Sequence, residues 1–499
     1  MISVSDIQRL IDDDSNSEKK RFAAIGQRYY EADHDILKCR FFYHNADGKL
    51  VEDKTRANIK ISHPFFALLA DQLPAYMLSF DENPIRAKEN VEGLQEHLDT
   101  YFDSEFWAEF GDYILDAYVK GFGYMYAYKN AENRMAFQCA DSMGVVEVRE
   151  SDTDDHCKYI IYWYIDRIEK GKKKIMRIQV WSDKETTYFV KDGETGKITI
   201  DKDVEINPRP HVVYTDQETG KRMGYGFGYI PFWRLDNCKK QFSGLKPIKG
   251  IIDDYDMHAC SLSNNLIDFD TPLHVVSGYQ GDNLDELQQN LKTKKIVGVD
   301  ADGDVQVRTV DVPYQARKEK LEIDERNIYI FGQGFNPAQV GDGNITNVVI
   351  QSRYTLLELK ASKMHKRSNK VLEQLVKVVL DEINKTHKKD YQLSDICFHF
   401  PHNIMTNQTE NVQNAKIEAE TRQIEINTIL NAASNVGDEQ TLKAICDVME
   451  WDYEALKNQV EKFREEQNFA DAKALLDDIV PEDEGNAAAP TQPMFSPGA

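Results

Sequence analysis

Apolar residues recur at spacings of three and four along several stretches of the chain, which is the pattern of helices with one buried face. They predict one helix over residues 94–120 and another over residues 246–270, which Pro272 ends. The longest such pattern covers residues 347–384, and a shorter one covers residues 313–331. The apolar positions of the longest helix are Ile350, Tyr354, Leu357, Ala361, Met364, Val371, Leu375 and Val378. The chain is therefore expected to be built around long helices.

A different pattern predicts strands between the first two of these helices. Short segments rich in aromatic and β-branched residues are separated by turn residues such as Asp192-Gly193. These segments are Tyr124–Lys129, Gly144–Arg149, Tyr159–Ile165, Ile175–Trp181, Thr187–Lys191 and Lys197–Ile200. Such a succession predicts a strand meander, so the expected fold class is α+β.

Residues 271–312 separate two of the predicted helices and indicate a small α/β insert. Its expected parts are a strand Leu273–Ser277, a helix Leu284–Leu291, and strands Lys295–Val299 and Val305–Thr309. Long helices on either side of such an insert predict a rod with a protruding tip. Residues 332–346, which follow the second of these helices, are rich in glycine and asparagine and carry hardly any charge, so they predict a flexible loop.

The charge of the chain narrows the possible functions. The 84 Asp and Glu residues outnumber the 61 Lys and Arg residues, and the formal net charge is -23. A protein that grips DNA usually presents a basic face, so this charge disfavours a repressor or a nuclease unless basic residues cluster locally. It suits a passage that contains DNA without holding it, because strong phosphate contacts would stall movement.

The length of the chain and its lack of targeting segments limit the possible domain organisation and membrane association. A chain of 499 residues exceeds the size at which one hydrophobic core keeps growing, so two or more substructures are expected. The N-terminus lacks a basic flank followed by an apolar stretch, and no uninterrupted apolar run is long enough to cross a bilayer. The 7 scattered cysteines contain no CxxC pair and indicate reduced thiols. We therefore expect a protein without membrane contact.

Acidic clusters are the candidates for metal binding or acid–base chemistry. Asp254 and His258 stand four residues apart on a predicted helix, but two ligands are too few for a metal site, so we favour a solvated face. The acidic segment Asp152–His156 lies between strands, where a loop is favoured over a calcium site. No GxxxxGK[ST] loop and no G-x-S-x-G motif occurs. The sequence therefore predicts no catalytic residue, no metal and no cofactor.

A basic stripe on the longest predicted helix stands out in this acidic chain. Its members fall near one face of the helix, with Lys366 beside them, and are Lys360, Lys363, Arg367, Lys370 and Lys377. We favour pairing of this basic helix face with acidic residues of a neighbouring subunit over contact with DNA. A solvated surface is the third possibility.

Several segments, taken in order, carry a resemblance to a known family. The segment NIKISHPFFALLADQLPAYML (58–78) is followed by AYVKGFGYMYAY (117–128), and YIPFWRLDN (229–237) by IIDDYDMHACSLSNN (251–265). Residues 344–360 then resemble a helix entry in which Asn344-Ile345-Thr346-Asn347 stand in place of Ser-Gly. Together these segments resemble the portal proteins of tailed bacteriophages, particularly the type found in siphophages of Gram-positive hosts.

The resemblance implies a portal fold with a mixed α/β wing, a two-helix stem, a small α/β clip and a helical crown. The implied parts are a wing at 1–245 with 385–407, stem helices at 246–270 and 313–331, a clip at 271–312, a tunnel loop at 332–346, a linking helix at 347–384, a crown at 408–480 and a disordered tail at 481–499. Uncharged side chains of the loop would then contact DNA weakly in a channel. The loop residues expected there are Gly332, Gln333, Gly334, Asn336, Gln339 and Asn344.

The same resemblance implies a ring of about 12 identical subunits at one capsid vertex, through which double-stranded DNA is packaged, retained and ejected. The implied partners are the large terminase subunit, the head-completion adaptor, the scaffold and the major capsid protein. The protein would be part of the virion, assembled in the host cytoplasm, and would not be an enzyme.

Two other functions remain as alternatives. One is a different structural head protein, but the arrangement of two helices around an insert disfavours it. The other is a metal-dependent nuclease that would use Asp253, Asp254, Asp256 and His258. A ring with a central hole would favour the portal, whereas a monomer that cleaves DNA with magnesium would favour the nuclease.

Overall fold

A computed structural model describes most of residues 2–400 and parts of the remainder. The segments of this range that it leaves out are 55–56, 89–90, 131, 151–156, 170–172, 216–221, 269–272, 309–313, 337–346 and, except for Asn283 and Leu287, 280–298. Beyond residue 400 it describes 416, 421–432, 437–449, 453 and 457. The chain divides into two compact units, residues 1–405 and residues 406–499.

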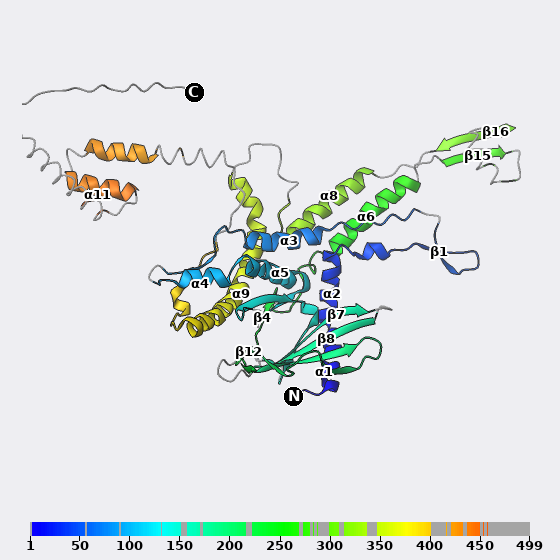
Figure 1. The fold of residues 1–499 in the computed structure, drawn as a ribbon. Coiled ribbons are helices and arrows are strands. Elements are labelled where there is room, and N and C mark those ends of the chain that lie inside the picture. The colour runs from blue at the N-terminus through cyan, green and yellow to red at the C-terminus, as the bar shows by residue number, and fades with distance from the viewer. Residues whose placement is uncertain are drawn as a thin grey trace, which may run out of the picture. The chain divides into compact units, whose positions relative to one another are not determined.

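The first unit combines helices and strands, as the α+β expectation requires (Figure 1). Its described α-helices are α1 (Val4–Ser15), α2 (Glu18–Tyr30), α3 (Phe65–Met77), α4 (Leu94–Tyr101), α5 (Ser104–Lys120), α6 (Lys249–Asp268), α8 (Tyr314–Phe331) and α9 (Asn347–His387). Its described strands are β1 (Phe42–His44), β2 (Leu50–Glu52), β3 (Ile85–Ala87), β4 (Phe122–Lys129), β5 (Met135–Ala140), β6 (Val145–Arg149), β7 (Cys157–Glu169), β8 (Lys173–Trp181), β9 (Glu185–Asp192), β10 (Ile198–Ile200), β11 (Arg209–Pro210), β12 (Val212–Thr215), β13 (Arg222–Tyr225), β14 (Phe232–Asp236), β15 (Leu273–Tyr279), β16 (Val299–Arg308) and β17 (Ile396–Phe398).

The predicted strand meander is confirmed by the larger sheet. Its strands follow the order β10-β9-β8-β7-β6, each antiparallel to the next, and β11 also pairs with β9. The predicted strand Tyr124–Lys129 instead belongs to a separate three-stranded sheet, β14-β4-β5. Strand β5 was not predicted, although it pairs with β4 along six residue pairs.

The helix predicted over residues 94–120 is two helices in the structure. Helix α4 ends at Tyr101, and α5 begins at Ser104. Asp103 lies between them as the N-cap of α5, where its carboxylate accepts the backbone N–H of Phe106 at 3.0 Å. A capping carboxylate competes with continued helix, so apolar spacing alone did not reveal the break.

Helices α6 and α8 lie side by side in opposite directions and lead to the hairpin β15–β16 (Figure 1). The hairpin confirms the predicted strand Leu273–Ser277. Val305 to Arg308 belong to a longer strand that begins at Val299, so the predicted start at Val305 is wrong. Most of the predicted helix Leu284–Leu291 and of the strand Lys295–Val299 lies outside the described residues.

The main core lies where α3, α5 and α9 meet the three-stranded sheet. Its buried side chains include Phe66, Phe110, Met125, Trp233 and Leu375. A second core joins α1 to the larger sheet through Ile7, Ile11, Ile161 and Ile178. Among the described helices, none is both long and apolar enough for a membrane crossing.

In the second unit, residues 421–432 are helical and α11 runs over Asp438–Met449. Both helices lie within residues 408–480, the range in which the resemblance implies a helical crown. The predicted disordered tail at 481–499 lies outside the described residues.

Candidate functional site: the loop anchor and the basic helix face

The first residues of the glycine- and asparagine-rich loop are held against helices α3 and α9. The Gln72 side chain donates its Nε2 hydrogen to the carbonyl of Phe335 at 2.8 Å, and its Oε1 accepts the N–H of the same residue at 2.9 Å. The Phe335 ring stacks on Tyr354 with centroids 4.5 Å apart and planes 7° apart. Tyr354 in turn stacks on Tyr76. We call residues 332–336 with these contacts the loop anchor.

Two glycines allow the loop anchor to approach α3 closely. A Cβ atom at Gly332 would lie 2.6 Å from Leu69 Cδ1, and one at Gly334 would lie 2.0 Å from Leu69 Cδ2. Real side chains do not reach such distances, so larger residues would push the loop away from α3. Gln333, between them, has a left-handed backbone with φ of 51°, which carries a local cost for a residue with a Cβ.

Lys360 completes the loop anchor from inside the protein. Its Nζ donates to the carbonyls of Leu69 at 3.0 Å and of Gly332 at 3.3 Å, and it lies 4.7 Å from the centre of the Tyr118 ring. The side chain is buried, and among the described residues it has no carboxylate partner. Burial lowers the pKa of Lys360 to about 7. The helical spacing predicted that Lys360 belongs to an exposed basic face. This prediction is wrong, because the side chain is buried.

The other members of the predicted face remain on the outside of α9. Lys363, Lys370 and Lys377 are exposed, and so is Lys366. Arg367 is half-buried, and its Nη1 lies 3.5 Å from the carbonyl of Asp236. None of these side chains forms an ion pair with a residue that the structure describes. The basic helix face thus consists of Lys363, Arg367, Lys370 and Lys377.

The remaining predicted loop residues are only partly described. Asn336 donates to the Glu325 carboxylate on α8 at 3.3 Å. Gln339 and Asn344 lie outside the described residues. The structure thus brings four of the six predicted loop residues together at the base of the loop, where they hold it in place.

The acidic residues of α6 are not gathered into one site. Asp253 accepts the Tyr29 hydroxyl and pairs with Lys249 at 2.7 Å, whereas Asp254 pairs with Lys320 and lies 3.5 Å from His258. Over the described part of the chain, no three His, Cys, Asp or Glu side chains are placed to hold a metal ion. The predicted acidic segment Asp152–His156 lies outside it.

Asp256 is the buried exception on α6. Its carboxylate lies 2.6 Å from Nδ1 of His34 and 2.8 Å from Nδ1 of His63, and it also accepts the His63 N–H at 3.0 Å. Burial opposes the ionised form, but these hydrogen bonds outweigh it and hold the pKa of Asp256 below its usual value. The cluster joins α6 to two segments near the N-terminus and has a structural role.

Sequence reasoning missed the inward position of Lys360 and the part played by Gln72. A signal for Lys360 was present, because it lies three residues after Leu357 and four before Met364, on the apolar face of the helix. No local pattern in the sequence indicates that Gln72 binds the backbone of Phe335, which lies 263 residues further along the chain.

Comparison with known proteins supplies the wider context of this arrangement. The family model described as "Phage portal protein, SPP1 Gp6-like" matches residues 8–472. The portal protein of Bacillus phage SPP1 is 24% identical over 411 residues, which cover 82% of this chain and 78% of that protein. The portal protein of Clostridium phage phiCD119 is 22% identical over 401 residues, which cover 77% and 82%.

Proposed function

Because the chain belongs to the family of SPP1 Gp6-like phage portal proteins, we propose that it forms a closed ring of about 12 identical subunits around a channel for double-stranded DNA. Its function is that of a phage portal, a structural component of the capsid used in genome packaging. The observation that carries the proposal is the family match, which extends over both compact units of the chain.

In this ring we assign α6 and α8 to the stem and the hairpin β15–β16 to the clip. Residues 1–245 with 385–407 form the wing, residues 347–384 the linking helix and residues 408–480 the crown. The assignment of the stem is supported by apolar side chains that α6 and α8 leave exposed, including Met257, Leu266, Ile267, Ile323 and Ile330. Exposed apolar surface of this kind is covered when identical subunits pack around an axis.

The tunnel loop at 332–346 faces the channel in this proposal. The loop anchor supports it, because the anchor fixes the base of the loop against α3 and α9. The uncharged side chain of Gln339 would meet phosphates without holding them, because it brings no positive charge to the DNA backbone.

Replacing Gln339 by glutamate tests this role of the loop. Rings should form normally, but DNase-protected DNA in capsids should decrease, because a ring of added carboxylates repels the passing phosphates. Gln374→Glu, at an exposed position of α9, adds the same charge elsewhere and serves as the control. Loss of rings with folded subunits would instead assign the loop to assembly.

The basic helix face is proposed to pair with acidic residues of the neighbouring subunit. Its side chains form no ion pair with a described residue, while the chain as a whole carries a net charge of -23. Contact with DNA is the competing possibility. Neutralising Lys363, Arg367 and Lys370 should loosen rings in native mass measurements at raised salt. Unchanged rings with altered DNA retention would favour the DNA contact.

The proposed partners follow from the position of a portal in the virion. They are the large terminase subunit during packaging, the head-completion adaptor afterwards, and the scaffold and major capsid protein around the wing. The ring would be assembled in the host cytoplasm and incorporated at one capsid vertex.

Negative-stain images of the purified protein test the central proposal. A ring with a central hole is the expected result. A monomer that cleaves DNA in the presence of magnesium would overturn it, and the variants Asp253→Asn and Asp254→Asn would then show whether the acids of α6 are responsible.

A further inference from the structure

The hairpin β1–β2 projects from the first unit and exposes apolar side chains on both of its faces (Figure 1). Phe42 and Leu50 lie on one face, because the register pairs Phe42 with Glu52 and His44 with Leu50. Their exposed fractions are 52% and 57%, and that of Tyr43 on the other face is 51%. Large apolar side chains that gather on one exposed element indicate a surface that a partner covers.

The two strands of this hairpin belong to no larger sheet. Among the described strands, β1 and β2 pair only with each other. A hairpin of two strands is at best marginally stable in water, because it has no apolar layer to pack against. A partner that covers Phe42 and Leu50 would supply that layer.

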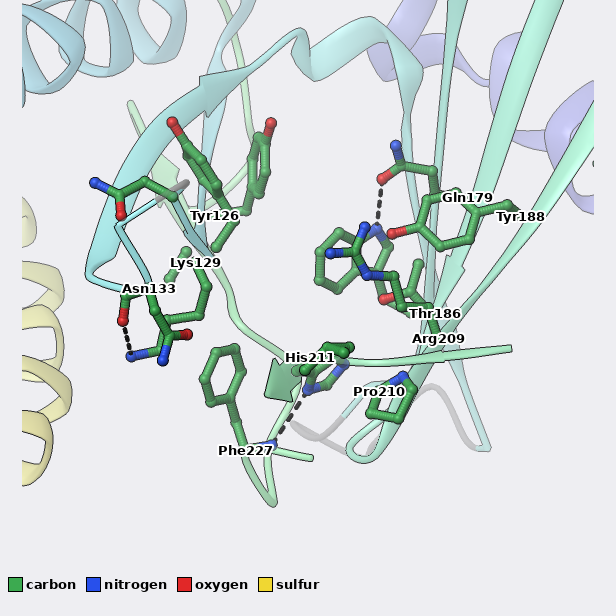
Figure 2. A pocket seen from close by; sticks show the side chains of 15 residues that line it. Tyr126, Lys129, Asn133, Gln179, Thr186, Tyr188, Arg209, Pro210, His211 and Phe227 are labelled. Carbon is green, nitrogen blue, oxygen red and sulfur yellow. Dashed lines mark hydrogen bonds between the residues drawn. The ribbon is translucent and has the colours of Figure 1, made fainter. Parts of the chain in front are cut away.

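A pocket between the larger sheet and the three-stranded sheet shows, in contrast, how the chain covers aromatic side chains from within. Figure 2 shows Tyr126 on one wall of this pocket and Gln179 on the other. Trp181, which also lines the pocket, is only 7% exposed, and its indole N–H is donated to Gln179 at 3.0 Å. Phe42 receives no comparable cover from its own chain, because half of its surface is exposed.

The hairpin β1–β2 is attached to the first unit beside α6. The extended segment that leads from the hairpin to α3 follows this helix. In it, the N–H of Ile59 donates to the side chain of Asn264 at 2.6 Å, and the N–H of His63 donates to Asp256 at 3.0 Å. Helix α8 also packs against α6. The hairpin therefore leaves the chain at the helix pair α6–α8, which we assign to packing between subunits.

Charge favours a second copy of this chain as the partner. Residues 39–64, which contain the hairpin β1–β2, have five Lys or Arg residues and three Asp or Glu residues, whereas the whole chain carries a net charge of -23. Helix α6 has four Asp residues and one Lys, and it leaves Met257, Leu266 and Ile267 exposed. The hairpin segment and the helix pair are thus both apolar in part and opposite in net charge, which makes them complementary.

We propose that the hairpin β1–β2 is an arm that packs on the helix pair α6–α8 of the neighbouring subunit. The inference rests on the proposed ring, in which the helix pairs of identical subunits surround one axis. Phe42 and Leu50 then lie against apolar side chains that the helix pair leaves exposed in the single subunit. Each subunit gives one arm and receives one, as a heterologous contact in a closed ring requires.

Photo-crosslinking in intact rings of the full-length protein tests the proposal. With p-benzoyl-phenylalanine in place of Phe42, illumination should join neighbouring subunits into a covalent dimer on a denaturing gel. Mass spectrometry of the digested dimer should place the linked residue within 249–268 or 314–331. The same photoreactive residue in place of Ile200, which is 58% exposed on β10, is the control and should give no such product.

Leu50→Asp measures what the arm contributes to the ring. The concentration of protein at which half of the rings dissociate should rise about tenfold, because a carboxylate would be buried in the contact. Ile200→Asp is the matched control, since its exposed fraction equals that of Leu50 to within one percentage point, and it should leave this concentration unchanged. Dissociated Leu50→Asp subunits should unfold at the wild-type temperature, because Leu50 is exposed in the single subunit.

Three outcomes would overturn the proposal. These are intact rings in which the photoreactive residue at position 42 links no subunits, a link to any other part of the same or the neighbouring chain, and Leu50→Asp rings as stable as the wild type. If the wild-type protein forms no rings at all, the proposed portal function fails and this inference fails with it. Rings that form without the arm contact refute only the inference, so the two failures are distinguishable.

Discussion

Replacing Lys360 by methionine tests whether a buried amine holds the start of the loop. In the folded chain its Nζ donates to the carbonyls of Leu69 and Gly332 and forms no ion pair with a described residue. Methionine fills a similar volume but donates nothing, so both carbonyls lose this partner. The loop anchor should become less firmly attached to α3.

The magnitude of the effect follows from the pKa of Lys360. Burial lowers it from 10.5 to about 7, so between these two pH values the unfolded chain binds more protons than the folded chain. Each pKa unit is worth about 1.4 kcal/mol, so keeping the buried amine ionised costs the fold about 5 kcal/mol below pH 7. This cost is relieved as the pH rises toward 10.5, and the wild-type protein should gain stability over that range.

The measurement compares the unfolding temperatures of the wild-type protein and Lys360→Met from pH 7 to pH 10.5. The unfolding temperature of the wild type should rise relative to that of the variant as the pH increases, because only the wild type has a buried amine to deprotonate. Lys363→Met is the control, since Lys363 is exposed on the same helix and its replacement should give no such pH dependence. A difference between wild type and Lys360→Met that stays constant with pH would refute the reasoning.

Three further results are expected. Gly334→Ala should lower the free energy of unfolding by about 1–3 kcal/mol, measured by thermal unfolding, because its Cβ would lie 2.0 Å from a Leu69 methyl. Asp256→Asn should cost about 3–5 kcal/mol in denaturant unfolding, since a buried carboxylate is lost between two histidines. Because the pKa of Asp256 is lowered, its contribution is present above pH 3.8 and lost in more acidic solution. Lys363→Glu combined with Lys370→Glu should break rings apart in native mass measurements by reversing the basic helix face.

Each of these three has a matched control. A Cβ at Gly250 meets nothing within 4 Å, so Gly250→Ala should not reproduce the loss seen at Gly334. Asp254→Asn, on the exposed side of the same helix, should cost far less than Asp256→Asn. Lys385→Glu reverses an exposed charge near the end of α9, outside the basic helix face. If the rings of Lys385→Glu are as unstable as those of the double variant, the basic helix face is not the subunit interface.

The spacing of apolar residues predicted the helices and strands whose conformation is determined by their own sequence. The strand meander from β6 to β10 and the long helices α6 and α9 were expected because apolar spacing and turn residues are local signals. Strand β5 was missed, since its pairing with β4 depends on a partner strand and only weakly on its own composition. The break at Asp103 was also local, but a cap within a continuous apolar pattern is easily passed over.

The candidate site was less predictable, because its contacts join distant parts of the chain. The basic helix face was derived from spacing alone, which could not distinguish the buried Lys360 from exposed Lys363. The two differ because Lys360 finds carbonyl acceptors on α3 and at the end of α8. The loop was recognised by its composition, but the attachment of its first five residues depends on Gln72 and Tyr354. No sequence motif near either residue predicts this role.

The buried cluster around Asp256 has a consequence for the order of folding during synthesis. His34 precedes its carboxylate partner by 222 residues, so at a typical rate of about 5–20 residues per second it leaves the ribosome roughly 10–45 s earlier. Over that interval the imidazole has water in place of its partner, and the N-terminal helices lack the contact that joins them to α6. The N-terminal part of the first unit can therefore reach its final packing only after α6 has been translated.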